Sequence, residues 1–483
     1  MTRLGKTSII AGTANLLLFL LTGVMPYDQQ QLHYFNLAEA QEAIEEEAEE
    51  EEVEVEDEEE EEEEEEGACI DYDSTENTIV INCDGSFLDV VQAINDDPEI
   101  LEDLGNGEYL LNANLEVADD VSFEMNSDED DLQYLKIAGA NGIIVNGRIE
   151  ISGIIITSWD TEANSPIFQT ITGSVPRAFI NLRGSEGGFV HDSEIAYLGY
   201  QEFGRRGLDL FGDGPSHDLE IRGSKFHNMW FAFYSRGAYN IVVDGNEYYD
   251  NIKYALDPHS GTHDMNITNN WLHHNPIGAI CSDRCYNILI EGNLVEHNTD
   301  HGIFLSRNMY DSIVRDNHVS NTPSGITVSE SPNNQIYHNT IEGATRSGIR
   351  LFNPELPDDG VTEGNLVYNN VISSSDDGIS AARSHDNILE SNTFSDIESS
   401  EYRLSGGSSI IIRGQHFDNA LIGQEGSATE NVVEIVDSGI IEVIEGESDG
   451  EEESEGELHN TKSEPYRRTL SDGDSITVKS SSS

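Results

Sequence analysis

The stretch His301-Gly-Ile-Phe-Leu-Ser-Arg307 decides the fold, because its opening triplet recurs along the chain. Ser324-Gly-Ile326 and Ser347-Gly-Ile349 follow at intervals of roughly 23 residues, a length typical of one solenoid coil. Earlier copies of the same apolar pattern are Phe231-Ala-Phe233, Tyr254-Ala-Leu256 and Ile277-Gly-Ala279. Gly, Asn and Asp turns separate the copies, without a convincing helix between them. The pattern predicts an all-β fold in which single coils stack as a parallel β-helix.

A second strand in each coil ends in Asn. This column comprises Val-Val-Asp-Gly-Asn246, Leu-Ile-Glu-Gly-Asn293, Val-Arg-Asp-Asn317 and Ile-Tyr-His-Asn339. Because Asn tolerates left-handed turns and bonds to backbone groups, we expect these residues to stack as a structural ladder.

The two ends of the chain differ from this repeating body. Arg3 and Lys6 precede an apolar run, which predicts a signal peptide or signal anchor within residues 1–30 and a secreted or cell-surface protein. Residues 31–67 read as an acidic, Glu-rich linker and residues 446–483 as a disordered acidic and Ser-rich tail. The β-helix domain is therefore expected over residues 68–445.

Near its start the body carries one amphipathic segment, Ser86-Phe-Leu-Asp-Val-Val-Gln-Ala-Ile-Asn95. It predicts a short helix with Ser86 as its N-cap. Such a helix suits the end of a solenoid, because it covers the edge of the first coil.

The charge balance excludes one class of partner. Asp and Glu number 93 against 24 Lys and Arg, for a net charge of −69. Nucleic acid is not an expected partner, because binding it needs a basic surface. The acidic surface suits high salt, which screens self-repulsion.

The four cysteines allow two local pairs if the chain is exported. These pairs are Cys69 with Cys83 and Cys281 with Cys285, and the alternative for either is a set of free buried thiols. The chain has no Cys-x-x-Cys pattern, so we expect no zinc site.

The chemistry centres on Asp257-Pro258-His259. On an extended segment, residues two apart share one face, so Asp257 and His259 point the same way. Aligning Ala255 with Gly278 and Gly302 places His259 level with Ser282 and Ser306, and Asp257 level with Tyr234 and Ile280. Four of the few basic residues fall near the same band of strand ends: Arg236, Arg284, Arg307 and Arg350.

This combination suits removal of a proton from a carbon next to a carboxylate. Arginine neutralises the carboxylate, and a neutral imidazole near its ordinary pKa is a competent base. We therefore expect His259 as the base, Asp257 as the residue that orients it, and Tyr234 or water as the group that returns a proton from the opposite face. Arg236, Arg307 and Arg350 are expected to bind substrate.

The stretch from about Asp192 to Asn353 resembles the bacterial mannuronan C5-epimerases of alginate biosynthesis. The matching motifs include Ala196-Tyr-Leu-Gly-Tyr200, Asp257-Pro-His259 and His301-Gly-Ile-Phe-Leu-Ser-Arg307, in an order and spacing that agree over about a third of the chain. The resemblance implies a right-handed parallel β-helix that acts as a polyuronate C5-epimerase. It also implies His259 as the base that removes the C5 proton, and Arg284 as the arginine that neutralises the carboxylate.

This chain departs from the family motif Asp-Pro-His-Asp at its fourth position, which is Ser260, and it has Asp283 before the candidate arginine. Three other functions stay open: a polysaccharide lyase acting by β-elimination, an inverting hydrolase near Asp376-Asp377, and a non-catalytic polysaccharide-binding β-helix. We expect an anionic polysaccharide as partner, a monomer, no cofactor and no metal. Membrane contact is expected only through the N-terminal segment.

Overall fold

The structure, a computed structural model, describes residues 68–94, 97–184, 186–211, 218–354, 360–406 and 408–413, with strands at 421–425, 431–436, 442–443 and 475–478. The predicted signal or anchor in residues 1–30 and the linker up to residue 67 lie outside the described residues. The predicted tail over residues 446–483 also lies outside them, apart from strand β45 (Ser475–Val478), which pairs antiparallel with β43 (Asn431–Val436). These segments stay predictions.

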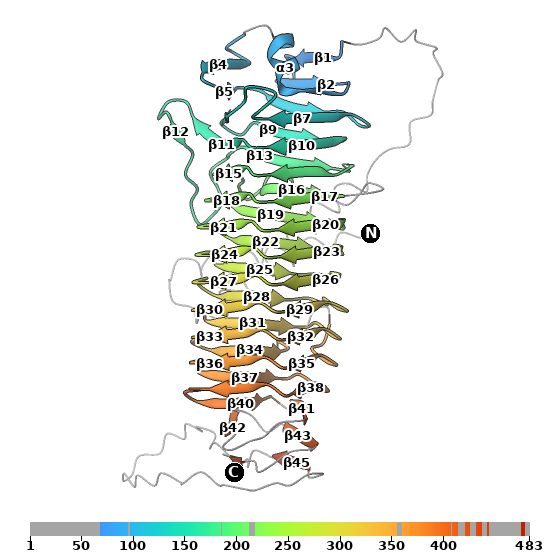
Figure 1. Cartoon of the computed structure of the whole chain (residues 1–483), viewed down its shortest axis with the longest axis vertical. Helices are drawn as coiled ribbons and strands as arrows, with labels where there is room; N and C mark the ends of the chain where they lie inside the picture. Colours follow the sequence, from blue (N-terminus) through green and yellow to red (C-terminus); the bar gives the residue numbers. More distant parts are fainter. Residues whose placement is uncertain are drawn as a thin grey trace, which may run out of the picture. The chain divides into compact units, whose positions relative to one another are not determined.

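The described chain winds as a right-handed solenoid with three sheets (Figure 1). Sheet A carries the candidate site, and its neighbouring strands are parallel from β2 to β44. In spatial order the strands of sheet A are β1 (Ile70–Asp73), β2 (Thr78–Ile81), β6 (Asn114–Val117), β9 (Gly142–Val145), β13 (Phe179–Arg183), β16 (Gly207–Phe211), β19 (Phe231–Arg236), β22 (Tyr254–His259), β25 (Ile277–Cys281), β28 (His301–Leu305), β31 (Ser324–Ser329), β34 (Ser347–Phe352), β37 (Asp377–Ala382), β40 (Ser400–Ser405), β42 (Leu421–Glu425) and β44 (Glu442–Val443).

Sheets B and C form the other two sides of each coil. Sheet B contains β3 (Gly85–Ser86), β7 (Ser122–Asn126), β10 (Arg148–Ser152), β14 (Gly188–His191), β17 (Leu219–Arg222), β20 (Tyr239–Asp244), β23 (His263–Thr268), β26 (Tyr286–Glu291), β29 (Ile313–Arg315), β32 (Gln335–Tyr337), β35 (Leu366–Tyr368), β38 (Asn387–Glu390), β41 (Ser409–Arg413), β43 and β45. Sheet C contains β4 (Leu101–Gly105), β5 (Glu108–Leu111), β8 (Tyr134–Ala138), β11 (Ile155–Asp160), β12 (Ser165–Pro166), β15 (Glu194–Ala196), β18 (Lys225–His227), β21 (Glu247–Tyr249), β24 (Trp271–His273), β27 (Leu294–Glu296), β30 (His318–Ser320), β33 (Thr340–Glu342), β36 (Val371–Ser373) and β39 (Thr393–Ser395).

The predicted coil repeat is confirmed. Its copies open six consecutive strands of sheet A, from β19 to β34, and Ile303, Ile326 and Ile349 align and lie buried in the core. The glycine of the repeat is required by close packing. A Cβ at Gly302 would lie 2.6 Å from Val319 Cγ1 and 2.7 Å from the Gly325 carbonyl oxygen, well inside van der Waals contact.

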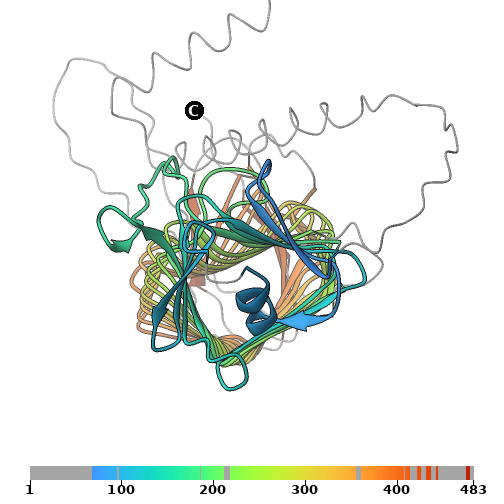
Figure 2. The same cartoon turned by 90° about the horizontal axis from the view of Figure 1, so that it is seen from above.

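The predicted N-terminal helix is also confirmed, as α3 (Phe87–Ile94). It buries Phe87 and Val90 at the end of the solenoid, where Figure 2 shows it lying across the coil when viewed along the axis. At its start the Asp89 carboxylate accepts a hydrogen bond from the Ser86 N–H at 2.8 Å, which satisfies one backbone donor there.

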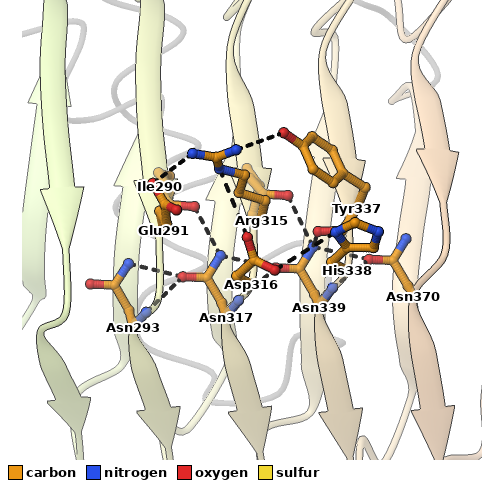
Figure 3. A network of polar contacts seen from close by, with 11 residues as sticks. Ile290, Glu291, Asn293, Arg315, Asp316, Asn317, Tyr337, His338, Asn339 and Asn370 are labelled. Atoms are coloured by element: carbon orange, nitrogen blue, oxygen red, sulfur yellow. Dashed lines mark hydrogen bonds and ion pairs between the residues drawn. The ribbon is translucent and has the colours of Figure 1, made fainter.

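The asparagine ladder runs along the solenoid through the turns that join sheet B to sheet C (Figure 3). Asn317 illustrates the pattern: its Nδ2 donates to the Ile290 carbonyl at 2.9 Å and to Asn339 Oδ1 at 2.9 Å. The left-handed backbone belongs to the residue before each ladder asparagine, such as Asp316 with φ 56°, and not to the asparagine itself. That turn directs the following amide into the interior, where it meets buried backbone groups.

Only one of the two cysteine pairs is bonded among the described residues. Cys69 and Cys83 form a disulfide, as one of the predicted pairs. Cys281 and Cys285 are free buried thiols, which was the alternative to a second disulfide. No helix in the described part of the chain is long and apolar enough to cross a membrane.

Candidate active site

The outer face of strand β22 carries the predicted catalytic pair. Parallel pairing with β19 sets Asp257 level with Tyr234 and His259 level with Arg236. Asp257 is 3% exposed and His259 is 9% exposed, while Leu256 and Phe233, one position earlier on the two strands than Asp257 and Tyr234, lie in the hydrophobic core. The prediction that Asp257 and His259 share an outward face is therefore confirmed, as is the alignment of Asp257 with Tyr234.

The next coil confirms the rest of the predicted alignment. Leu256 pairs with Ala279, so Asp257 is level with Ile280. Ser282 N–H donates to the Pro258 carbonyl at 3.0 Å, and its own carbonyl accepts from Ser260 N–H at 3.1 Å. Ser282 therefore lies beside His259, as the repeat predicted.

Tyr234 packs directly against the candidate base. The centroids of its ring and of the His259 imidazole are 5.6 Å apart, with the two planes tilted by 33°. The Arg206 guanidinium carbon also lies 4.1 Å from the Tyr234 ring centroid, a cation–π contact. Tyr234 is 2% exposed, so these contacts hold its ring in place.

Arg206 and its neighbour Asp209 are site residues that the sequence reasoning missed. Asp209 is level with Tyr234 and fully buried, and its Oδ2 accepts a hydrogen bond from Arg206 N–H at 3.0 Å. Burial raises the pKa of the Asp209 carboxyl to about 7, against the opposing effect of the Arg206 charge and backbone N–H. The register shift between Gly207 and Asp209 breaks the coil alignment, so counting residues along the chain does not place Asp209 beside Tyr234.

A chain of polar contacts leads from His259 into the next coil. His259 Nδ1 lies 2.6 Å from Ser260 Oγ, and Ser260 Oγ donates to Asp283 Oδ2 at 2.9 Å. Arg284 then donates to both oxygens of Asp283, from Nε at 2.9 Å and from a terminal nitrogen at 3.2 Å. Ser260 therefore contacts both the imidazole and Asp283, the other departure from the family motif.

The four predicted arginines lie at different distances from His259. Arg236 is its direct strand neighbour, and Arg284 lies in the turn after β25 with its side chain 66% exposed. Arg307 is buried in the turn after β28, two coils along. Arg350 shares the column of Asp257 but lies four strands further along sheet A, roughly 19 Å at the usual strand spacing.

A second polar cluster lies on the same sheet, at the start of β28. The buried His301 has Nδ1 2.8 Å from Thr327 Oγ1 and Nε2 3.6 Å from Asp300 Oδ2, and Asp300 forms an ion pair with Arg346. Burial, with the charges of Arg346 and Arg350, lowers the pKa of His301 well below its usual value. His301 is therefore neutral and internally bonded, which fits a structural role.

The inverting-hydrolase alternative finds little geometric support. Asp377, from the hydrolase alternative, is 5% exposed and accepts a hydrogen bond from Arg403 Nε at 2.6 Å. No cluster of three or more His, Cys, Asp or Glu side chains within the described ranges has the geometry to hold a metal ion.

Known proteins match parts of this chain. The family described as "Right handed beta helix region" matches residues 206–355. The mannuronan C5-epimerase of Pseudomonas syringae pv. tomato is 27% identical over 181 residues, which are 36% of this chain and 33% of that protein. The mannuronan C5-epimerase AlgG of Azotobacter vinelandii is 28% identical over 259 residues, 51% of this chain and 49% of that protein. The matches thus span a third to a half of these relatives' length.

The fold has a solved counterpart. The crystal structure of the periplasmic alginate epimerase AlgG superimposes with a TM-score of 0.56 at 22% identity, covering 75% of this chain and 84% of that chain. This likeness establishes the shared β-helix architecture.

Proposed function

We propose that the protein is a polyuronate C5-epimerase, because stretches of this chain are 27% and 28% identical to two mannuronan C5-epimerases. The observation that carries the proposal is the placement of His259 on the outer face of β22, between Arg236 on one coil and Asp283 and Arg284 on the next. A base beside cations is what abstraction of a proton next to a carboxylate requires.

In the proposed reaction, arginine binds the carboxylate of one sugar and stabilises the charge that develops on it. Arg236 is the best placed for this role, because it is the strand neighbour of His259. Arg284, which the family resemblance favoured, already donates two hydrogen bonds to Asp283. We therefore assign carboxylate neutralisation to Arg236, with Arg284 at the edge of the site.

His259 then removes the C5 proton: the C–H bond breaks, an N–H bond forms, and the electron pair delocalises into the carboxylate. A second group returns a proton on the other face of C5. Direct contact between the Tyr234 and His259 rings leaves no room for a sugar between their faces. If Tyr234 is the donor, it must act through its hydroxyl at the ring edge, and water is the alternative.

The column of Arg350 supports a polymeric substrate. Arg350 lies on the outer face of sheet A roughly 19 Å from Asp257, four strand spacings along the solenoid. An extended polyuronate lying along the axis would place a later carboxylate near Arg350. We propose further that the protein works outside the cytoplasm, since its structural counterpart is periplasmic and its own N-terminus carries the predicted export signal.

The test is hydrogen exchange during turnover. Purified protein is incubated with polymannuronate in deuterated water, and products are followed by proton NMR and ultraviolet absorbance. We expect deuterium at C5 and guluronate signals, without new chain ends, and loss of both in His259→Gln. Unsaturated ends would indicate the lyase instead, while an inert wild-type protein on every polyuronate offered would favour a polysaccharide-binding role.

A further inference from the structure

The imidazole of His259 is linked to an acidic residue on another coil through one hydroxyl group. Ser260 Oγ lies 2.6 Å from His259 Nδ1 and donates its only proton to Asp283 Oδ2 at 2.9 Å. A serine hydroxyl has one proton and two lone pairs, so once that proton points at Asp283, the oxygen can only accept from the imidazole. The Nδ1 atom must then carry the ring proton.

The charge state of Asp283 agrees with this direction. Burial alone would raise the pKa of its carboxyl, but hydrogen bonds from Arg284 and Ser260 and the charge of His259 outweigh burial and lower it. Asp283 is therefore ionised near neutral pH and can only accept from the serine hydroxyl.

We propose that Ser260 and Asp283 are positioning residues for His259. The Asp283 carboxylate, acting through the Ser260 hydroxyl, holds the imidazole with its proton on Nδ1. The Nε2 atom then carries the lone pair that receives the C5 proton. The inference rests on the proposed role of His259 as the base. It assigns a function to the two positions at which this chain departs from the Asp-Pro-His-Asp motif. Here the second carboxylate comes from the following coil, and a serine bridges the gap.

The backbone explains how an acid on the next coil reaches the imidazole. Ser260, Asp283 and Arg284 all have left-handed backbones, with φ of 43°, 59° and 61°. Gly261 N–H donates to the Asp283 carbonyl at 2.8 Å, which stacks the two turns. Within the second turn the Asp283 side chain is 15% exposed and the Arg284 side chain 66% exposed. The left-handed pair thus turns the carboxylate toward His259 and keeps the guanidinium at the surface, where it holds the carboxylate from outside.

The chain of contacts from Asp283 through Ser260 to His259, called the relay below, would act on the reaction in two ways. It keeps the correct ring nitrogen unprotonated before the transfer, and it stabilises the imidazolium formed afterwards. Asp283 gains no proton in this scheme, because the transferred proton stays on Nε2.

Activity measurements test the coupling between the two residues. We expect Ser260→Ala and Asp283→Asn each to lower kcat by about 10- to 100-fold with little change in KM. The double variant should have a kcat no lower than that of the less active single variant, because both substitutions break the same chain of contacts. Ser260→Asp in the Asp283→Asn background should restore much of the activity, because it places a carboxylate directly beside Nδ1. If the fold losses in kcat of the two single variants multiply in the double variant, the two residues act independently and the relay is refuted.

A matched control exists on the same coil. Asp264 also has a left-handed backbone and a histidine contact, to His263 Nδ1 at 2.7 Å, but it lies on sheet B away from the site. Asp264→Asn should leave kcat and KM unchanged. A loss there as large as in Asp283→Asn would mean that removing any turn carboxylate perturbs the enzyme.

The pH profile provides a readout that a purely structural role would not move. Without the Asp283 carboxylate, the charged imidazole loses support, so the acid limb of kcat/KM should shift to lower pH in Asp283→Asn. The other charged or titratable groups around His259 remain in this variant, and they are Tyr234 and Arg236 from β19, Asp257 from β22, and Arg284 from the turn after β25. An unchanged limb would contradict the inference.

The tautomer itself can be observed without substrate. Nitrogen-15 NMR of selectively labelled protein, with His259→Gln to assign its signals, should show neutral His259 protonated on Nδ1, and a loss of that preference in Ser260→Ala. Protonation on Nε2 in the wild type would refute the relay even if the protein is an epimerase. Conversely, the expected tautomer in a protein that exchanges no C5 hydrogen would uphold the relay and refute the proposed function.

Discussion

Arg236 on β19 is the direct strand neighbour of His259 on β22, and both side chains lie on the outer face of sheet A. Neighbouring strands in a sheet are about 4.8 Å apart, so Arg236 and His259 are close enough to contact one sugar. In the proposed reaction, Arg236 binds its carboxylate and His259 removes the proton from C5. This relationship leads to the first prediction.

Arg236→Ala should lower kcat/KM on polymannuronate by about 100- to 1,000-fold, the usual cost of removing one group that stabilises charge in the transition state. The matched control is Arg315→Ala. Arg315 is also an outward arginine, paired with Glu291 at 3.0 Å and bonded to Tyr337, but it lies on sheet B (Figure 3). Equal losses in the two variants would argue against a specific role for Arg236.

Arg350→Ala should act differently from Arg236→Ala, because Arg350 lies four strands from Asp257. We expect KM to rise for long chains, with little change for oligomers too short to span roughly 19 Å. Kinetics on a ladder of oligomer lengths would measure this, and a loss that is independent of chain length would contradict it.

Asp209 should make stability fall as pH rises. Its carboxyl has a pKa of about 7 in the folded chain because of burial, against an ordinary value of 3.8. Between about pH 4 and pH 7 the folded chain keeps a proton that the unfolded chain has lost, so ionisation of Asp209 costs stability as pH rises through this window. Asp209→Asn should therefore match the wild type near pH 4 and exceed it at pH 8. Urea unfolding at both values would measure the difference, with the exposed Asp119→Asn as control.

Asn317→Ala should destabilise the solenoid by about 3 kcal/mol, because it removes the acceptor of the buried Asn293 backbone N–H and Nδ2 and the Nδ2 donor to the Ile290 carbonyl. The exposed Gln335→Ala, one coil along, should change stability by less than about 0.5 kcal/mol. Thermal unfolding of the two variants is the comparison, and similar melting temperatures would show that the ladder adds little.

The Cys69–Cys83 disulfide closes a loop with a sequence separation of 14. Loop-entropy arguments give a loop of this size about 3 kcal/mol of stabilisation. Replacing both cysteines by serine should make the first coil more sensitive to limited proteolysis. A reducing agent should sensitise the wild type in the same way and leave the serine variant unchanged, and protection that survives both treatments would contradict the prediction.

The coil stacking and its register could be predicted from the sequence, because each coil of a solenoid repeats the same local backbone geometry. The spacing of the six recurring triplets predicted the stacking of β19 to β34, and the same register placed Asp257 beside Tyr234. The alternation of strand residues placed Asp257 and His259 on one outward face. Each of these inferences depends only on short-range geometry copied from coil to coil, so counting residues is sufficient.

Only the tertiary structure shows which contacts the turn residues make, because the turns differ from coil to coil. The resemblance to the epimerase family marked Ser260 and Asp283 as departures and implied Arg284 as the arginine that neutralises the carboxylate. In the structure, the left-handed backbones of these three residues join them into a chain of contacts that ends on His259. The register shift before Asp209 likewise concealed its place beside Tyr234. The sequence by itself determined the coil and the outward placement of His259. The groups that surround His259 depend on backbone angles and on a register shift, neither of which follows the coil repeat.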